Sequence, residues 1–268
     1  MTGLRAFREA FLSADTLASP GSDDFADFDA RRVRYEILWA FYENTAYRSI
    51  HAWATAYKAQ YGLYKYIRSL YNPAFRLAEF WKTHLWGGSL DPAAGDGDVV
   101  TSALPIEIGS ASRGPGNAGL RPAISQIWTW SNWPIRKDVI TLWGTILGDV
   151  GIRVVDDTAR AKVYLAAVHP GTLAGVTLDA YNNVKAYTIE EARTHPDHPA
   201  ETVTYTETAE RGYGDDVIFR TTLNGTPYAW NGAAAEWVEP YGFIPLVLIR
   251  HNDTGLPWGW SELHPSRA

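Results

Sequence analysis

The hydrophobic period of this chain changes once, at Gly148, and that change limits the folds the chain can adopt. Before Gly148 apolar residues recur at the three- and four-residue spacing of helices, as in residues 30–44. After it they alternate with polar residues, as expected of strands with one buried face. Helices therefore precede strands instead of alternating with them. This order predicts an α+β fold, in which an N-terminal helical half packs on a mostly antiparallel β half.

Four helices are predicted ahead of Gly148 from apolar spacing and from the residues at their ends. They cover residues 30–44, 73 to the Gly87-Gly88 pair, 122–131 and 134–147, and an aromatic segment lies at 57–71. Asn72 can cap the second helix, and Pro73 can take its first position, where a missing N–H costs nothing. Its apolar residues are spread too widely for one exposed face, so we expect it to be buried on several sides. Gly148 is expected to end the last helix.

The β half is predicted from alternation and from turn residues. A hairpin is expected around the turn at 156–158, and Asn224-Gly225 between two apolar runs is the strongest short hairpin signal in the chain. The predicted strands are residues 151–155, 162–168, 175–178, 184–189, 202–208, 217–223, 228–230 and 245–249, with a further short one at 103–108. After the last strand, Ser261 has the position of a helix N-cap.

Composition excludes several classes of protein. Lys and Arg number 24 against 30 Asp and Glu, a net charge of −6, whereas tight nucleic-acid binders are usually basic because they neutralise phosphates. The chain has no cysteine, which removes disulfide scaffolds and thiol nucleophiles and fits an intracellular protein. No signal peptide is recognisable, and the longest apolar runs fall short of the ~20 residues of a membrane span. We therefore expect a soluble protein.

Aromatic residues are frequent, with 12 Trp and 15 Tyr, and two interpretations remain open. Large aromatic cores with an interface would account for them, because Trp and Tyr bury much area while keeping one polar atom. A sugar-binding or oligomer-forming surface would account for them as well, because Trp, Tyr and Arg dominate binding energy at interfaces.

Several segments resemble functional motifs but lack the spacing those motifs require. The loop at 109–119 is rich in glycine but has no Gly-Lys-Ser or Gly-Lys-Thr, so it is not a Walker-type phosphate loop. Asp91, Asp96 and Asp98 lack the alternating ligands and the distant Glu of a calcium loop. We interpret both stretches as solvated loops.

The histidines and paired carboxylates also suggest no site. His195-Pro196-Asp197-His198 is fixed as a loop by its prolines, so no helical register aligns ligands for a metal. A pair between His251 and Asp253 is conceivable, but no activated serine accompanies it, and structural hydrogen bonding is preferred. The adjacent acids at 156–157, 190–191 and 215–216 point to opposite faces of strands beside turns, so we interpret them as solvated edges. We predict no catalytic residue, no metal ligand and no cofactor.

A set of short sequence pieces lies along the chain in a distinctive order. The most specific piece is Tyr241-Gly242-Phe243-Ile244-Pro245-Leu246-Val247, followed by Asn252 and Gly259-Trp260-Ser261-Glu262-Leu263. The other pieces are residues 39–44, 71–73, 87–88, 130–133, 144–149, 156–157, 168–170 and 184–187. Each piece is weakly specific alone, but their order and spacing cover residues 30 to 263. Together they resemble the N-terminal part of the portal proteins of tailed bacteriophages.

The resemblance implies a ring, usually of twelve subunits, at one vertex of the capsid, through which double-stranded DNA is packaged and ejected. It implies as partners the chain itself, the large terminase, scaffolding protein, major capsid protein and head-completion proteins, with DNA passing through without being tightly bound. It implies no chemistry by the portal itself and no membrane contact. The protein would be in the host cytoplasm before assembly and in the virion afterwards.

The resemblance also divides the chain. It implies a flexible arm at 1–29, a helical part of the portal wing at 30–148, a β-rich part of the wing at 149–250, and the start of a linker at 251–268. In the family a stem and a clip follow the residues that resemble Ser261, so we expect this chain to be a truncated or split wing, a fragment or a prophage remnant. The alternative function is a Trp-rich carbohydrate-binding or glycoside-cleaving β-rich protein.

Overall fold

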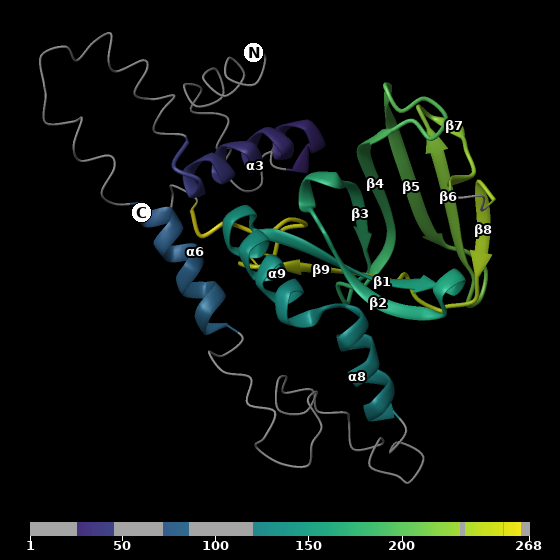
Figure 1. The fold of residues 1–268 in the computed structure, drawn as a ribbon, viewed down its shortest axis with the longest axis horizontal. Helices are drawn as coiled ribbons and strands as arrows, with labels where there is room; N and C mark the ends of the chain where they lie inside the picture. Colours follow the sequence, from purple (N-terminus) through teal and green to yellow (C-terminus); the bar gives the residue numbers. More distant parts are fainter. Residues whose placement is uncertain (1–25, 46–71, 86–119, 231–233, 254, 264–268) are drawn as a thin grey trace, which may run out of the picture.

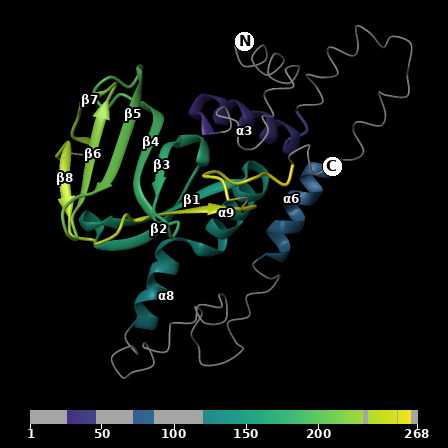
Figure 2. The ribbon, with the colours of Figure 1, turned by 180° about the vertical axis from the view of Figure 1, so that it is seen from behind.

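The structure, a computed structural model, describes residues 26–45, 72–85, 120–230, 234–253 and 255–263. Helices come first and strands follow, which confirms the predicted α+β fold with N-terminal helices packed against antiparallel sheets. The helices gather on one side of the molecule and the larger sheet lies on the other (Figure 1), as the view from behind also shows (Figure 2). No helix in the described ranges has both the length and the apolarity needed to cross a membrane.

The helical elements are α3 (Phe28–Tyr42), α6 (Pro73–His84), α8 (Leu120–Trp130), α9 (Trp133–Leu147), and the short 3₁₀ turns η4 (Thr158–Arg160) and η5 (Pro170–Thr172). Their ends follow the predicted chemistry. The carboxylate of Asp27 accepts from Ala30 N–H at 2.9 Å, and the Asn72 side chain accepts from Phe75 N–H at 3.2 Å. Gly148 ends α9 with φ of 94°, a conformation that favours glycine.

The prediction that α6 is buried on several sides is wrong. Only its small residues Ala74 and Ala78 are buried, against α3 and α9, while Phe75 and Phe80 are about half exposed. Phe80 stacks at 4.3 Å on the ring of His84 of the same helix and still remains half exposed. Ala74 and Ala78 form a narrow stripe that lets α6 approach α9 closely. The large aromatic side chains of α6 lie outside this contact.

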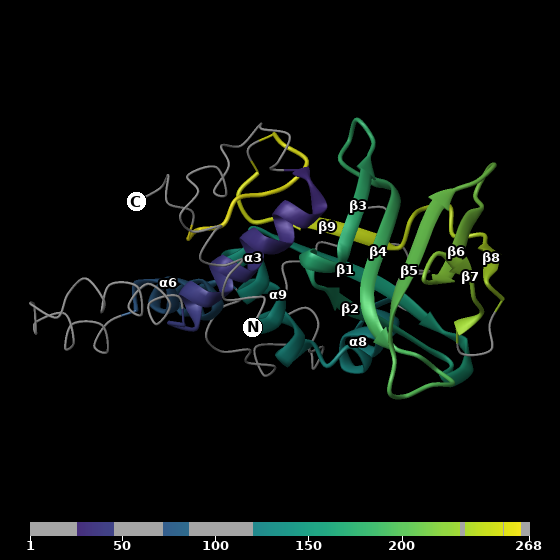
Figure 3. The ribbon, with the colours of Figure 1, turned by 90° about the horizontal axis from the view of Figure 1, so that it is seen from above.

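The strands are β1 (Asp149–Asp157), β2 (Lys162–Val168), β3 (Leu173–Leu178), β4 (Val184–Thr194), β5 (Thr202–Arg211), β6 (Val217–Leu223), β7 (Thr226–Pro227), β8 (Glu236–Glu239) and β9 (Leu246–Arg250). A three-stranded sheet has the order β2-β1-β9, and a six-stranded sheet has the order β3-β4-β5-β6-β7, with β8 paired to β6. All pairs are antiparallel. Seen from above, the strands of the smaller sheet run across those of the larger one (Figure 3).

Most predicted strands are present, and the hairpin at Asn224-Gly225 is confirmed, with positive φ at both residues. The predicted strand at 228–230 is wrong. Residues 228–230 form no strand; Trp230 donates from its indole to the Thr222 carbonyl at 3.3 Å and packs edge-on against Tyr205 at 5.0 Å. The sequence patterns did not predict β8, and they made β4 and β5 too short. The predicted strand at 103–108 and the segment at 57–71 lie outside the described residues.

The cores explain why the layers hold together. Apolar side chains of the two sheets face each other in one cluster, which includes Leu173, Val217, Phe219 and Leu246. A second cluster joins α3, α6 and the end of α9, and a third lies between α9 and the three-stranded sheet. The end of α9 and the start of β1 thus lie where the helices contact the sheets.

Candidate functional site

Two parts of the chain that are more than a hundred residues apart meet beside the end of α9. We call this place the C-terminal junction and define it by residues 145–149, 251–252 and 259–262. His251 N–H donates to the Gly148 carbonyl at 2.8 Å, and Glu262 N–H donates to the Thr145 carbonyl at 3.0 Å. Ser261 donates its hydroxyl to the Ile146 carbonyl. The last carbonyls of α9, which no longer have partners within the helix, are therefore satisfied by the C-terminal segment.

Two glycines let the backbones of the junction touch. A Cβ on Gly148 would lie 2.8 Å from backbone atoms of residues 259–261, and one on Gly259 would lie 2.5 Å from the Gly148 carbonyl oxygen. Real Cβ atoms do not approach backbone this closely. The junction therefore requires glycine at both positions, and at Gly148 the positive φ adds to that requirement.

Asp149, the first residue of β1, is completely buried under the junction. Its carboxylate accepts from Gly259 N–H at 2.7 Å and from the Tyr35 hydroxyl at 3.1 Å. Burial raises its pKa to about 7, and this effect is partly opposed by the bonds from Gly259 and Tyr35 and by the charges of Arg34 and Arg31. Burial, with the charge of Asp149 beside it, also raises the pKa of Tyr35. One carboxyl group thus joins α3, β1 and the C-terminal segment.

Arg31 fixes α3 to the same region from the other side. Its side chain is fully buried, it donates to the Leu173 carbonyl at 2.7 Å, and its guanidinium lies 3.5 Å from the ring centre of Trp258. A buried guanidinium on an indole face gains from both the hydrogen bond and the cation–π attraction. Arg31 and Asp149 therefore hold the C-terminal segment through side chains that cannot be reached from solvent.

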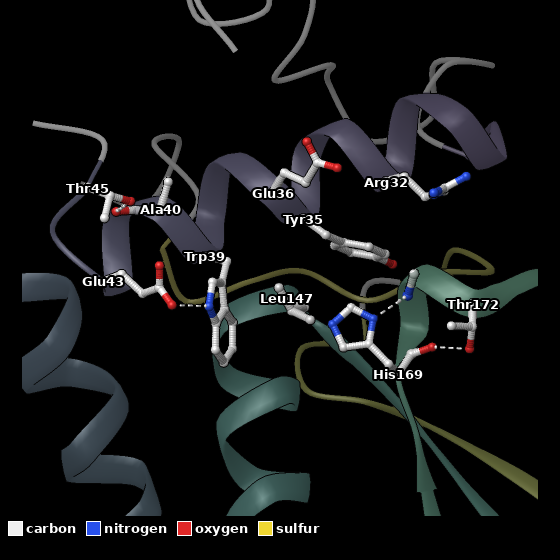
Figure 4. Close-up of a pocket in the computed structure, with 11 residues that line it drawn as sticks. Arg32, Tyr35, Glu36, Trp39, Ala40, Glu43, Thr45, Leu147, His169 and Thr172 are labelled. Carbon is white, nitrogen blue, oxygen red and sulfur yellow. Dashed lines mark hydrogen bonds between the residues drawn. The ribbon is translucent and has the colours of Figure 1, made fainter. Parts of the chain in front are cut away.

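A pocket of about 430 Å³ opens next to the junction, between α3 and η5. We call it the α3–η5 slot. Figure 4 shows Tyr35 and Trp39 pointing from α3 toward Leu147 and His169, while Glu36 points away from them. Trp39 donates from its indole to Glu43 at 2.8 Å, and Arg32 lies at the rim.

His169 supplies a polar group on the floor of the slot. Its Nδ1 accepts from Gly171 N–H at 3.0 Å, and burial lowers its pKa, so the ring is neutral at pH 7 with its proton on Nε2. That second nitrogen faces the side of Leu147 and Trp39 (Figure 4). The slot therefore combines aromatic side chains with the His169 imidazole and with charged side chains of both signs, Arg32, Glu36 and Glu43.

A second buried carboxylate ties the two sheets together. Glu207 on β5 accepts from the hydroxyls of Tyr187 and Tyr205, both at 2.6 Å, and pairs with Arg153 of β1 at 2.7 Å. Its carboxylate, which lies between two sheets, has partners on three strands. Such a network fixes the position of one sheet on the other.

The histidines weighed from the sequence lie apart from the junction or serve it structurally. His195 accepts from Asp197 N–H at 3.1 Å, and its ring lies 4.8 Å from that of His198. The described residues contain no group of three potential ligands placed to hold a metal ion. His251 contacts Glu262 at 3.1 Å and not Asp253, which pairs with Arg250. The stretches at 91–98 and 109–119 lie outside the described residues.

The carboxylate pairs differ in their surroundings. Asp157 caps η4 and pairs with Arg160, and Asp215 and Asp216 are exposed in a turn, as predicted. The interpretation of the pair at 190–191 as a solvated edge beside a turn is wrong. Both residues lie inside the longer β4, half-buried, where Glu191 pairs with Arg193.

The predictions assigned no role to Arg31, Tyr35, Asp149 or Glu207 as a buried polar set. Glu207 carried a readable signal, because it alternates with Val203, Tyr205 and Ala209 and so falls on the buried face of its strand. Asp149 carried none of this kind, since its burial depends on a segment more than a hundred residues away. The role of these buried polar groups is structural, because they hold backbone segments in place.

Neither a scan against models of protein families nor a search of curated proteins finds a match.

Proposed function

We propose that this protein is a structural subunit of a bacteriophage portal ring, corresponding to the wing of the family. The observation that carries the proposal is the C-terminal junction. Three pieces of the resemblance, at 144–149, 252 and 259–263, are joined by hydrogen bonds. Gly259 N–H donates to Asp149 and Glu262 N–H donates to the Thr145 carbonyl, while the Asn252 side chain donates to the Trp260 carbonyl at 3.1 Å. These pieces therefore form one packed unit, as the proposal requires of segments that belong to the same part of a wing.

A second group of pieces also meets. The Asn72 side chain donates to the carbonyls of Phe41 and Tyr42 at 3.1 and 2.8 Å, which joins the piece at 71–73 to the one at 39–44. The same Asn72 caps α6. One amide therefore sets both the start of α6 and its angle to α3.

The surface supports a role in protein assembly. Val247, in the most specific piece of the resemblance, and Ile249 lie on the same face of β9 and are 58% and 37% exposed. Exposed apolar side chains of this size mark contact surfaces when they lie close together. In a ring every subunit presents one surface to the next subunit and a different one to the previous subunit, so apolar exposure on an otherwise well-packed wing is expected.

Under this proposal the subunit performs no chemistry of its own. It would assemble with copies of itself, and through the ring with the terminase, scaffolding, capsid and head-completion proteins that the resemblance implies. Double-stranded DNA would pass without being held, which the net charge of −6 favours. The location would be the host cytoplasm and then the portal vertex of the virion.

Sedimentation velocity and native mass spectrometry of the 268-residue chain, followed by negative-stain electron microscopy, test the proposal. We expect concentration-dependent association and closed rings or arcs. A chain that stays monomeric at the highest attainable concentration would contradict the proposal. Saturable protection of Trp fluorescence by oligosaccharides in such a monomer would support the carbohydrate-binding alternative instead.

A further inference from the structure

We infer that residues 4–12 of this chain occupy the α3–η5 slot of the same molecule and lie antiparallel to α3. This contact forms within one copy, so it does not depend on the proposed function. Residues 4–12 lie outside the described residues, and three properties identify them as the occupant. These are their sequence pattern, their connection to α3 and the charges at the two ends of the slot.

Residues 4–12 read Leu-Arg-Ala-Phe-Arg-Glu-Ala-Phe-Leu, which is an amphipathic pattern. Leu4, Phe7 and Phe11 recur at the spacing that places side chains on one face of a helix. The charged residues of the segment fall on the remaining sides. Amphipathic helices bind by laying the apolar face into an apolar groove, with anchor side chains at this same spacing.

The slot offers apolar surface to such a face. Tyr35 and Trp39 point from α3 toward His169 (Figure 4), and Trp39 is only half-buried. The volume of about 430 Å³ lies in the range of about 300–1,000 Å³ typical of pockets that enclose a small molecule. The aromatic side chains of the slot can therefore pack against the rings of Phe7 and Phe11.

The segment and the slot agree in length, and the chain between them is long enough. From Arg32 to Glu43 the slot follows α3 for about 16 Å, and residues 4–12 would span about 14 Å as a helix. Residues 13–25 can extend over at most about 45 Å, so they can return to Asp27, the N-cap of α3. A tether this short gives a high effective concentration, which favours this segment over that of another copy.

Charges at the two ends of the slot determine the direction of the segment. Arg32 lies toward the start of α3 and Glu43 toward its end (Figure 4), while Glu36 is exposed between them. An antiparallel segment places Arg5 near Glu43 and Glu9 near Arg32, whereas a parallel one places like charges together. The slot has two glutamates and one arginine, and the segment has two arginines and one glutamate. Opposite charges at the rim of a contact orient the partners.

Cross-linking tests the contact and its direction, since a chain without cysteine allows thiols to be placed in pairs. Thr45 lines the Glu43 end of the slot, and Thr172 lines the Arg32 end (Figure 4). Thr2→Cys with Thr45→Cys, treated with a short thiol-reactive cross-linker at low protein concentration, should give a cross-link within one molecule. The matched control, Thr2→Cys with Thr172→Cys, should give several-fold less.

Substitutions in the background of the Thr2→Cys and Thr45→Cys pair give a second readout. Phe7→Ser removes an apolar anchor and should slow cross-linking by about tenfold or more. Leu17→Ser, in the connection to α3, should leave the rate unchanged. Arg5→Glu should slow cross-linking as well, and adding Glu43→Lys should restore part of the loss, because the two charges are then exchanged.

Two results would overturn the inference. Equal cross-linking at the two ends of the slot, with no effect of Phe7→Ser, would show that the segment does not occupy the slot. Cross-links found by mass spectrometry only between copies, and lost on dilution, would show that the segment does not bind its own molecule. Either result leaves the proposed function standing, because that function is tested by assembly.

Discussion

Asp149 makes the stability of this fold depend on pH. The carboxyl group is buried with its pKa raised from 3.8 to about 7, while in the unfolded chain it regains the lower value. Between about pH 4 and pH 7 the unfolded chain releases this proton while the folded chain keeps it, so stability falls as pH rises. Below pH 4 both states are protonated, and above pH 7 the loss is complete.

Replacing Asp149 by asparagine should remove this dependence. Asn keeps an oxygen that can accept from Gly259 N–H but has no proton to release. The free energy of unfolding of Asp149→Asn relative to the unchanged protein should therefore rise between pH 4.5 and pH 7.5, and urea titrations at both values measure it. All other titrating groups are shared, so they cancel to first order. A difference that is the same at both pH values would contradict the assignment.

Glu207 should be among the residues whose loss costs most stability. Glu207→Gln leaves one acceptor oxygen for the hydroxyls of Tyr187 and Tyr205 and for Arg153. Leaving buried donors and a charge without partners costs about 2–4 kcal/mol. Glu210→Gln on the same strand is the control, since that carboxylate pairs with Arg220 in solvent and should cost less than about 1 kcal/mol. Equal losses in urea unfolding would show that burial of Glu207 does not matter.

At the scale of elements, the junction is fixed by close backbone contact, and glycine substitutions test it. Gly148→Ala combines a positive φ with a clash, Gly259→Ala has the clash, and Gly214→Ala has φ of 65° with nothing within 4 Å of its Cβ. The strain of φ alone costs roughly 1–2 kcal/mol. We expect Gly148→Ala to lose clearly more stability than Gly214→Ala.

Hydrogen exchange shows where these substitutions act. The amides of Gly259 and Glu262, which donate to Asp149 and to the Thr145 carbonyl, should exchange faster in Gly148→Ala and in Gly259→Ala. They should stay protected in Gly214→Ala. Unchanged protection in all three variants would mean that the C-terminal segment is held by other contacts.

The elements that could be predicted are those whose signals are local. Asn72-Pro73 starts α6, Gly148 ends α9 and Asn224-Gly225 turns a hairpin, because each acts on its own backbone within a few residues. Three features could not be predicted because they depend on neighbours distant in the chain. They are the burial of α6, the strand β8 and the end of the strand pattern at Pro227. Ser261 makes one local and one distant interaction. Its hydroxyl accepts from Leu263 N–H, as a cap would, and it also donates to the Ile146 carbonyl.

The candidate site could also be predicted only in part, because much of it depends on contacts between distant parts of the chain. The resemblance of order and spacing included the pieces at 144–149, 252 and 259–263, which lie together in the structure. It did not indicate that a buried carboxyl group joins them, because period and spacing describe one element at a time. The pairing of Asp149 with Tyr35 and Gly259 is a property of the packed molecule.

At the scale of the whole molecule, charge should decide how the protein behaves toward DNA. A net charge of −6 opposes the phosphate neutralisation that produces nonspecific affinity, for which dissociation constants are typically about 10⁻⁴–10⁻⁶ M at physiological salt. A subunit past which DNA slides benefits from this repulsion, because attraction would slow the passage. We expect no change in the fluorescence anisotropy of a labelled duplex up to about 100 μM protein at physiological salt, whether the protein is assembled or not. Binding below about 10 μM with a steep dependence on salt would show that basic side chains gather on one surface despite the acidic total, and it would contradict a wing that does not hold DNA.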